Sequence, residues 1–167
     1  MTICTHGRQP LFGDVVDGEM RLSAFGRIAN DEWLRTAEVR PPVLLDAFVV
    51  MPDHAHLFFG IVPEDADRER EDRPGRRGTL PVCPCPEATG RRFGTAVPGA
   101  VASIMRQYKS IVTKRVRAID PTVRLWQRGF HGRVVRTERE ADALRRYVIE
   151  NPARWDPTAD RLDGHRR

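Results

Sequence analysis

The sequence predicts an α/β fold of the α+β kind, in which one antiparallel sheet carries its helices on one face. Two observations predict it. Short apolar, β-branched runs alternate with longer segments of helical spacing, and the 167 residues suit one domain of ordinary size. The predicted order is strand, helix, strand, strand, helix, strand, helix. Apart from the last helix, this order matches the split βαβ, ferredoxin-like sandwich.

The first part of the chain predicts one strand and one helix. Residues 2–5 (TICT) have the composition of a short strand, and residues 13–18 have that of a turn region. From Ser23 to about Val39, apolar residues recur on one broad helical face, and Ser23 is the expected N-cap. Two prolines from Pro41 onward end this helix, because proline lacks the N–H that a helix needs.

The next segment predicts a tight pair of strands. Residues 43–51 (VLLDAFVVM) form a nearly continuous apolar run, which is typical of a strand buried on both faces. A turn at Pro52 and Asp53 leads to a second strand at residues 54–62 (HAHLFFGIV). Strands joined this closely are expected to pair antiparallel.

Residues 63–97 differ in composition from the rest, because proline and glycine are frequent and Arg alternates with Asp and Glu. Such a segment buries too little apolar surface to become ordered, so it predicts a flexible insertion. The single domain is then expected to span residues 1–155, with a polar tail at 156–167.

The last part predicts a helix, an extended stretch and a final helix. Residues 100–118 carry one apolar stripe at helical spacing. Residues 123–130 and 133–136 are predicted to be extended. The run from Thr137 to Glu140 is a capping box, which opens a helix that ends near Glu150.

The distribution of charge favours a polyanionic partner. The net charge is +5, and residues 99–155 hold 13 Lys and Arg against five Asp and Glu, which is +8 for that segment. The absence of an 18-residue apolar run and of a signal peptide predicts no membrane span and a cytoplasmic, nucleoid-associated protein. The three cysteines lack the spacing of a disulfide framework.

A pair of histidines indicates a metal site. His54 and His56 are two residues apart in a predicted strand, so both imidazoles face one side and Ala55 faces the other. Their Cα atoms should lie about 6–7 Å apart, which suits one cation held between the rings. The alternative is that the pair only lines a polar strand edge.

The two tyrosines predict different environments. Tyr108 falls in the apolar stripe of its helix and is expected in the core. Tyr147 lies one position off the apolar stripe of the last helix, so its hydroxyl can reach a cleft, and Asn151 follows one turn later on the same face. The alternatives are a half-buried aromatic with a solvated hydroxyl and an asparagine that caps the helix.

Aromatic and basic residues interleave between the last two helices. Trp126 and Phe130 alternate with Arg124, Arg128 and Arg133. Aromatic rings within a basic segment are typical of surfaces that stack the bases of single-stranded nucleic acid. The alternative is a solvated charged face with two core aromatics.

Several stretches resemble the signatures of a known family. Residues 49–57 (VVMPDHAHL) resemble the "VMPNHVHLL" signature of single-tyrosine HUH transposases. Residues 126–130 (WQRGF), 133–136 (RVVR) and 147–152 (YVIENP) resemble their second signature, and residues 2–8 (TICTHGR) resemble their first strand. The similarity looks closest to the REP-associated tyrosine transposase branch, in which a tyrosine precedes an Asn-Pro pair by four residues.

This resemblance implies a ferredoxin-like sandwich that carries out a metal-dependent reaction on DNA. His54 and His56 would be metal ligands, Asn151 the polar third ligand, and Tyr147 the nucleophile. The substrate would be single-stranded DNA with a hairpin, as in palindromic repeats. Some relatives exchange the tyrosine helix between subunits, so a homodimer is one assembly to expect. The chain departs from the family at Asp53, where asparagine is usual, and in starting without the leader that relatives carry.

The expected mechanism uses Mg²⁺ or Mn²⁺ to polarise a phosphate oxygen while Tyr147 attacks in line. It leaves a 5′-phosphotyrosine and a free 3′-hydroxyl. The charges of Arg145 and Arg146 would favour the phenolate. The expected DNA contacts are Arg106, Lys109, Trp126, Arg128, Arg133 and Arg136.

Two other functions stay open on the sequence. One is a nucleic-acid-binding module of the same fold whose site has decayed, which would form no covalent product. The other is a hydrolytic nuclease that uses only the histidine pair and would still cleave DNA after Tyr147→Phe.

Overall fold

The computed structural model describes residues 1–40, 42–62 and 100–156. The predicted insertion at residues 63–97 therefore lies outside the described residues, as do Cys83, Cys85 and the tail after Asp156. Within the described part, no helix has the length and apolar character needed to cross a membrane.

One antiparallel sheet forms the centre of the molecule. Its strands lie in the order β1 (Thr2–Cys4), β5 (His54–Ile61), β4 (Val43–Val50). The predicted hairpin of β4 and β5 is confirmed, and its register shifts between Leu45 and Phe48. In this register His56 lies between Thr2 of β1 and a residue of β4.

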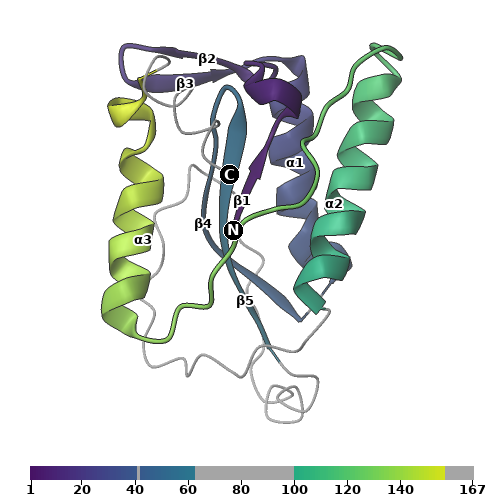
Figure 1. Ribbon diagram of the computed structural model, residues 1–167. Coiled ribbons are helices and arrows are strands. Elements are labelled where there is room, and N and C mark those ends of the chain that lie inside the picture. The colour runs from purple at the N-terminus through teal and green to yellow at the C-terminus, as the bar shows by residue number, and fades with distance from the viewer. Residues whose placement is uncertain (41, 63–99, 157–167) are drawn as a thin grey trace.

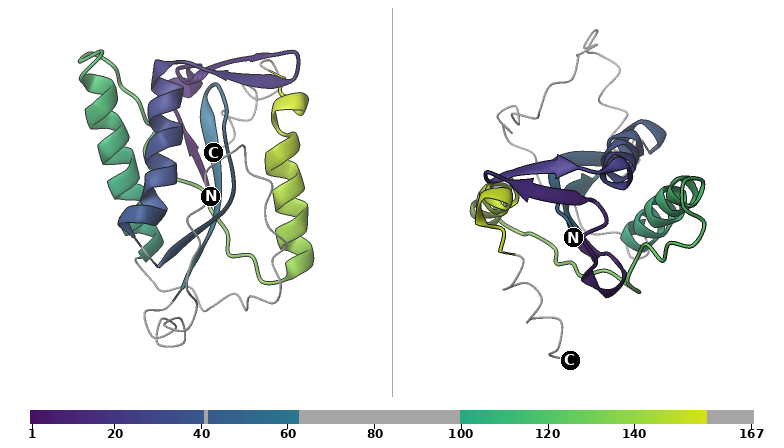
Figure 2. Two further views of the ribbon diagram at one scale, coloured as in Figure 1. Left: turned by 180° about the vertical axis from the view of Figure 1, so that it is seen from behind. Right: turned by 90° about the horizontal axis from the view of Figure 1, so that it is seen from above.

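Two helices cover one face of the sheet and a third lies over the other. Helices α1 (Ala24–Val39) and α2 (Ala100–Arg117) pack side by side, and α3 (Glu138–Glu150) lies across the sheet from them (Figure 1, Figure 2). The mixed fold with an antiparallel sheet and a separate C-terminal helix is therefore confirmed.

The two faces of β5 explain this arrangement. Ala55 and Leu57 belong to the main core with residues of α1 and α2, whereas Phe58 packs with Ala141 and Val148 of α3. Side chains alternate along a strand, so His54 and His56 point to the α3 face.

Helix α1 begins as predicted at Ser23. The Ser23 hydroxyl accepts a hydrogen bond from the Gly26 backbone N–H at 3.1 Å and donates one to the Leu11 carbonyl at 2.7 Å. Gly26 fits here because its backbone touches the Phe12 carbonyl, where a Cβ atom would lie only 2.0 Å from the oxygen.

The predicted turn region at residues 13–18 is a β-hairpin instead. Strands β2 (Gly13–Val16) and β3 (Glu19–Leu22) pair antiparallel. The turn itself is Asp17 and Gly18, with φ values of 55° and 77°. Left-handed residues at both central positions match the twist of the flanking strands, so the short strands can pair.

The strand predicted within residues 123–136 is absent as a regular element from the described part of the chain. The segment instead runs beside β1 and makes isolated bridges, Thr2 with His131 and Thr5 with Trp126. Two reasons are visible. Strand β1 has only three residues, and Gly129 has a left-handed φ of 75° that breaks the extended path.

Helix α3 begins at the predicted cap. The Thr137 hydroxyl accepts a hydrogen bond from the Glu140 N–H at 3.3 Å, as a capping box requires. The Glu140 carboxylate accepts from the Arg136 N–H at 3.1 Å, one residue before the position that a capping box uses.

Arg145 docks α3 onto the sheet. Its guanidinium donates two hydrogen bonds of 2.8 Å to the Asp46 carboxylate of β4 and further bonds of 2.7 Å to Glu138 and Asp142. The hydrogen bonds to Asp46, the largest cause, raise the pKa of Arg145 above its usual value. This two-pronged bond fixes the rotation of α3, and thereby the face on which Tyr147 lies.

We expect Gly26→Ala to lower the free energy of unfolding by at least about 2 kcal/mol, because the added methyl group meets a rigid carbonyl. Urea unfolding measures the change. Gly60→Ala is the matched control: its Cβ would lie 4.0 Å from Leu44, so the variant should gain about 0.5 kcal/mol. Equal effects of the two variants would contradict the close contact at Gly26.

We expect Arg145→Met to lower the free energy of unfolding by about 2 kcal/mol, because it removes charge-assisted bonds from a largely buried guanidinium. The neighbouring Arg146 is exposed, so Arg146→Met should change stability by less than about 0.5 kcal/mol. Urea unfolding of both variants distinguishes them. A loss that is the same for both would show that Arg145 does not anchor the helix.

Candidate metal and tyrosine site

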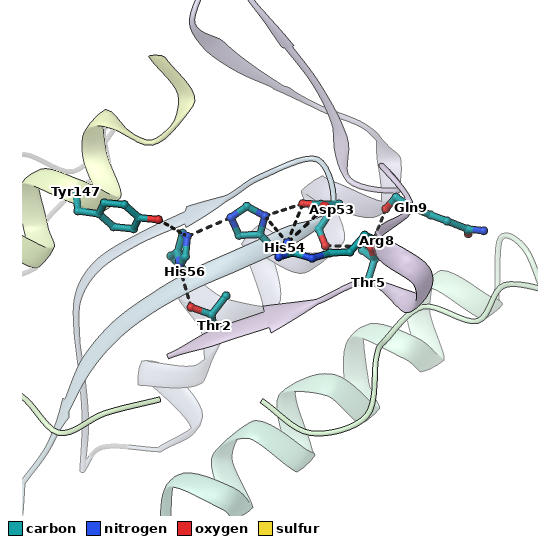
Figure 3. Close-up of polar contacts among 8 residues, drawn as sticks. All are labelled: Thr2, Thr5, Arg8, Gln9, Asp53, His54, His56 and Tyr147. Carbon is teal, nitrogen blue, oxygen red and sulfur yellow. Dashed lines mark hydrogen bonds and ion pairs between the residues drawn. The ribbon is translucent and has the colours of Figure 1, made fainter. Parts of the chain in front are cut away.

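The two histidines of β5 converge on one point. The Nε2 atoms of His54 and His56 lie 3.1 Å apart, and the ring planes meet at 78° (Figure 3). His54 is 3% exposed, so its ring is held within the fold. The face-sharing that period-2 spacing predicts is therefore present in the structure.

The Nδ1 atom of each imidazole contacts an oxygen atom on the side of the ring away from Nε2. His54 Nδ1 lies 2.6 Å from Asp53 Oδ1, and His56 Nδ1 lies 2.9 Å from Thr2 Oγ1. In the tautomer that protonates Nδ1, the rings donate to these oxygens and the two Nε2 lone pairs face each other. Two facing lone pairs at this distance repel unless a proton or a cation lies between them.

Burial keeps His56 neutral. Burial, the largest cause, and the neighbouring charge of His54 lower the pKa of His56 to about 3. Neutral imidazole is the form that binds metal ions. His56 is therefore in the protonation state of a ligand at neutral pH.

The distance between the nitrogens fits one divalent cation. Two ligands about 2.1 Å from an octahedral ion are about 3.0 Å apart at adjacent positions, close to the 3.1 Å between the Nε2 atoms. Among the described residues, no cluster of three or more His, Cys, Asp or Glu surrounds this point. Within the described part of the chain, a further ligand would therefore be a side chain of another type, or a carbonyl group.

Tyr147 reaches the same point from α3. Its hydroxyl lies 3.5 Å from His56 Nε2, and the two ring centroids are 5.2 Å apart (Figure 3). The side chain is 45% exposed. A phenol thus lies next to two converging imidazoles and stays open to a large substrate. Both parts of the site come from one chain.

Asn151 lies at the end of the same helix. It is the C-cap residue of α3, one turn beyond Tyr147, and it is 9% exposed. Four residues later, the Trp155 ring lies 5.6 Å from the His54 ring. The chain that leaves α3 therefore passes the histidine pair. Asn151 caps the helix, and its position one turn beyond Tyr147 is also compatible with a role as metal ligand.

The expected DNA contacts separate into two groups. Arg106 of α2 is exposed, and so are three arginines of the segment between α2 and α3, namely Arg128, Arg133 and Arg136. Phe130 is 38% exposed among them. Lys109 and Trp126 are engaged within the protein, and Tyr108 is in the core, where its hydroxyl donates to the Ala29 carbonyl.

Lys109 and Trp126 hold the segment after α2 in place. Lys109 Nζ donates to the carbonyls of Gln127 and Gly129 at 2.7 and 2.9 Å, and burial lowers the pKa of Lys109. The Trp126 Nε1–H donates to the Lys109 carbonyl, and its ring packs against Phe12. The structure thus favours the core alternative for Trp126 over a stacking surface.

Three residues around the histidines were assigned no role in the site on the sequence. Thr2 supports His56, Asp53 supports His54, and Arg8 lies 3.4 Å from Asp53 Oδ2. In the sequence, Asp53 was notable because it replaces the asparagine of the family signature. The contacts of Thr2 and Arg8 could not be predicted, because they depend on the pairing of segments that are distant in sequence. Arg145, expected to act on the tyrosine, is instead bound to three carboxylates.

Comparisons with known proteins find similarity in sequence and in fold. No protein-family model matches the chain. Over 156 residues the chain is 26% identical to an uncharacterized protein of Haemophilus influenzae. This match covers 93% of this chain and 80% of that protein. It is also similar to the solved structure of a REP-associated tyrosine transposase bound to a REP hairpin, with a TM-score of 0.54 and 16% identity. That match covers 92% of this chain but 64% of the other, less than two thirds of its length, and it shows a common fold.

Proposed function

We propose that this protein is a metal-dependent strand transferase, a transposase-like enzyme that cleaves single-stranded DNA through Tyr147. The observation that carries the proposal is the meeting of the Tyr147 hydroxyl with two converging imidazole nitrogens. His54 and His56, with Asn151, would hold Mg²⁺ or Mn²⁺. A bound cation of this kind neutralises charge on a phosphate oxygen and makes the phosphorus easier to attack.

In the proposed reaction the Tyr147 oxygen forms a bond to phosphorus as the bond to the 3′-oxygen breaks. The phenol proton passes to water, which reaches the exposed side chain, and the 3′-oxygen gains a proton and leaves as a hydroxyl. The product is a 5′-phosphotyrosine. A later attack by a 3′-hydroxyl reverses the step and reseals a strand. The bond energy is kept throughout, so the reaction needs no nucleotide cofactor.

The surface beside β1 supports a single-stranded substrate. Phe130 and Arg133 border a hollow of about 260 Å³ whose other lining residues are largely apolar, including Leu57, Phe59 and Val134. A hollow of this size and lining can accept an unstacked base, and the exposed arginines nearby suit the phosphates. A second hollow, of about 150 Å³, is lined by residues of α1 and α2. These helices cover the face of the sheet opposite to the one on which His54 lies.

A hairpin next to the cleaved strand is the proposed form of this substrate. Support comes from the sequence resemblance and from the shared fold with a transposase whose structure contains a REP hairpin. Because Tyr147 and the histidines meet within one chain, the proposed chemistry requires no second copy of the protein.

The reaction class can be tested by covalent trapping. We expect wild-type protein with Mn²⁺ and a pool of labelled single-stranded hairpins to give a protein–DNA band on a denaturing gel. Tyr147→Phe should reduce the band by more than about 1,000-fold, because the nucleophile is gone. EDTA should abolish it.

The chain offers a matched control, because it contains only two tyrosines. Tyr108→Phe removes a buried hydroxyl far from the histidines and should leave the covalent band. Cleavage without a linked product, surviving in Tyr147→Phe, would indicate a hydrolytic nuclease. DNA binding with no cleavage in any condition would indicate a binding module.

The proposed DNA surface makes a separate prediction about salt. We expect Arg128→Gln combined with Arg133→Gln to weaken binding of single-stranded DNA and to reduce the slope of log affinity against log salt by about 1.4, or about 0.7 per lost phosphate contact. Fluorescence anisotropy over a salt series measures it. Arg35→Gln on α1, outside the proposed DNA surface, should leave the slope unchanged, and an equal change there would refute the assignment.

A further inference from the structure

A buried carboxylate lies directly behind the histidine pair. Asp53 is 4% exposed, and its Oδ1 lies 2.6 Å from His54 Nδ1. This contact is on the side of the ring away from Nε2, so the carboxylate is not a ligand of the point where the Nε2 atoms meet (Figure 3). Any influence of Asp53 on that point must pass through His54 or through its charge.

Arg8 provides the counter-charge that allows this burial. Its Nη1 lies 3.5 and 3.4 Å from the two Asp53 oxygens and 3.4 Å from His54 Nδ1. A buried carboxylate without a partner would be strongly disfavoured, and the guanidinium supplies Asp53 with an ion-pair partner. Arg8 follows Gly7, and both have left-handed φ values, of 54° and 63°.

The left-handed backbone at Arg8 has a cost. A non-glycine residue in this region is sterically disfavoured, and such residues persist where the surroundings hold them. Here the segment around Arg8 is bound by hydrogen bonds to the turn between β4 and β5. The Thr5 N–H and hydroxyl both donate to the Asp53 carbonyl, at 2.8 and 3.0 Å, and the Phe12 N–H donates to the Pro52 carbonyl.

We propose that Asp53 is a positioning residue for metal binding, which acts through His54. This inference rests on the proposed function, because it assumes that the Nε2 atoms bind a divalent cation. Asp53 fixes the proton of His54 on Nδ1, so the Nε2 lone pair is turned to the cation. Its negative charge also makes the imidazole a stronger donor. Carboxylates hydrogen-bonded to ligand histidines typically change metal affinity by about 10–100-fold.

Two substitutions separate the hydrogen bond from the charge. Asp53→Asn keeps an oxygen that can accept from Nδ1–H but removes the charge, so Mn²⁺ affinity should fall by about 3–10-fold. Asp53→Leu removes both, so affinity should fall by about 10–100-fold. Asp31→Asn, an exposed position on α1, makes the same charge change on the far helix layer and should leave the affinity unchanged.

The experiment titrates each purified full-length variant with Mn²⁺ alone and reads free Mn²⁺ by electron paramagnetic resonance. A second readout needs no metal: the ¹⁵N shifts of the His54 ring show which nitrogen carries the proton. We expect Nδ1–H in wild-type protein and in Asp53→Asn, and a shift toward Nε2–H in Asp53→Leu. If Asp53→Leu does not fold, the fall in Mn²⁺ affinity in Asp53→Asn carries the test.

The outcomes separate this inference from the proposed function. Equal Mn²⁺ affinity in wild type and both Asp53 variants would overturn the positioning role while leaving a metal site in place. Graded Mn²⁺ affinity with no covalent DNA product would support the role of Asp53 and overturn strand transfer. An absence of Mn²⁺ binding by the wild-type protein would overturn both.

Discussion

The position of β5 between β1 and β4 is the constraint on which the site depends. Pairing on both edges fixes the register of the strand, and a shift by one residue would turn both histidines into the main core and Ala55 out of it. The same pairing with β1 brings Thr2 opposite His56. One strand register therefore sets the direction of both imidazoles and supplies the oxygen that holds one of them.

The second requirement is the docking of α3 on the opposite face from α1 and α2. Tyr147 and His56 are 91 residues apart in sequence, yet their side chains meet. Apolar contacts of Val148 and Ala141 bring the helix to the sheet, and the bond of Arg145 to Asp46 fixes its rotation. Apolar packing positions α3 on the sheet, and the directional ion pair orients the helix so that Tyr147 faces His56.

Burial and exposure are divided within the site. His54 and Asp53 are enclosed, where low solvent access strengthens their hydrogen bond and keeps the ring rigid. Tyr147 is half exposed, as the proposed attack on a polymer substrate requires. Arg128 and Arg133 are exposed in the segment that bridges β1, at the edge of the sheet opposite to β4. A rigid centre with an open nucleophile is consistent with a reaction on DNA, whose own bulk must be accommodated.

Local signals in the sequence are enough to predict several elements. The Ser23 and Thr137 caps, the apolar stripes of the helices, the β4–β5 hairpin and the shared face of the histidines all follow from neighbouring residues. Other features need partners that are distant in sequence, so they become visible only in the folded protein. The segment after α2 did not become a strand, because the short β1 offers few pairing groups, and Trp126 was drawn into the core against Phe12. The Arg8–Asp53–His54 contact likewise joins residues far apart in the chain, and no local pattern encodes a contact that exists only after the chain has folded.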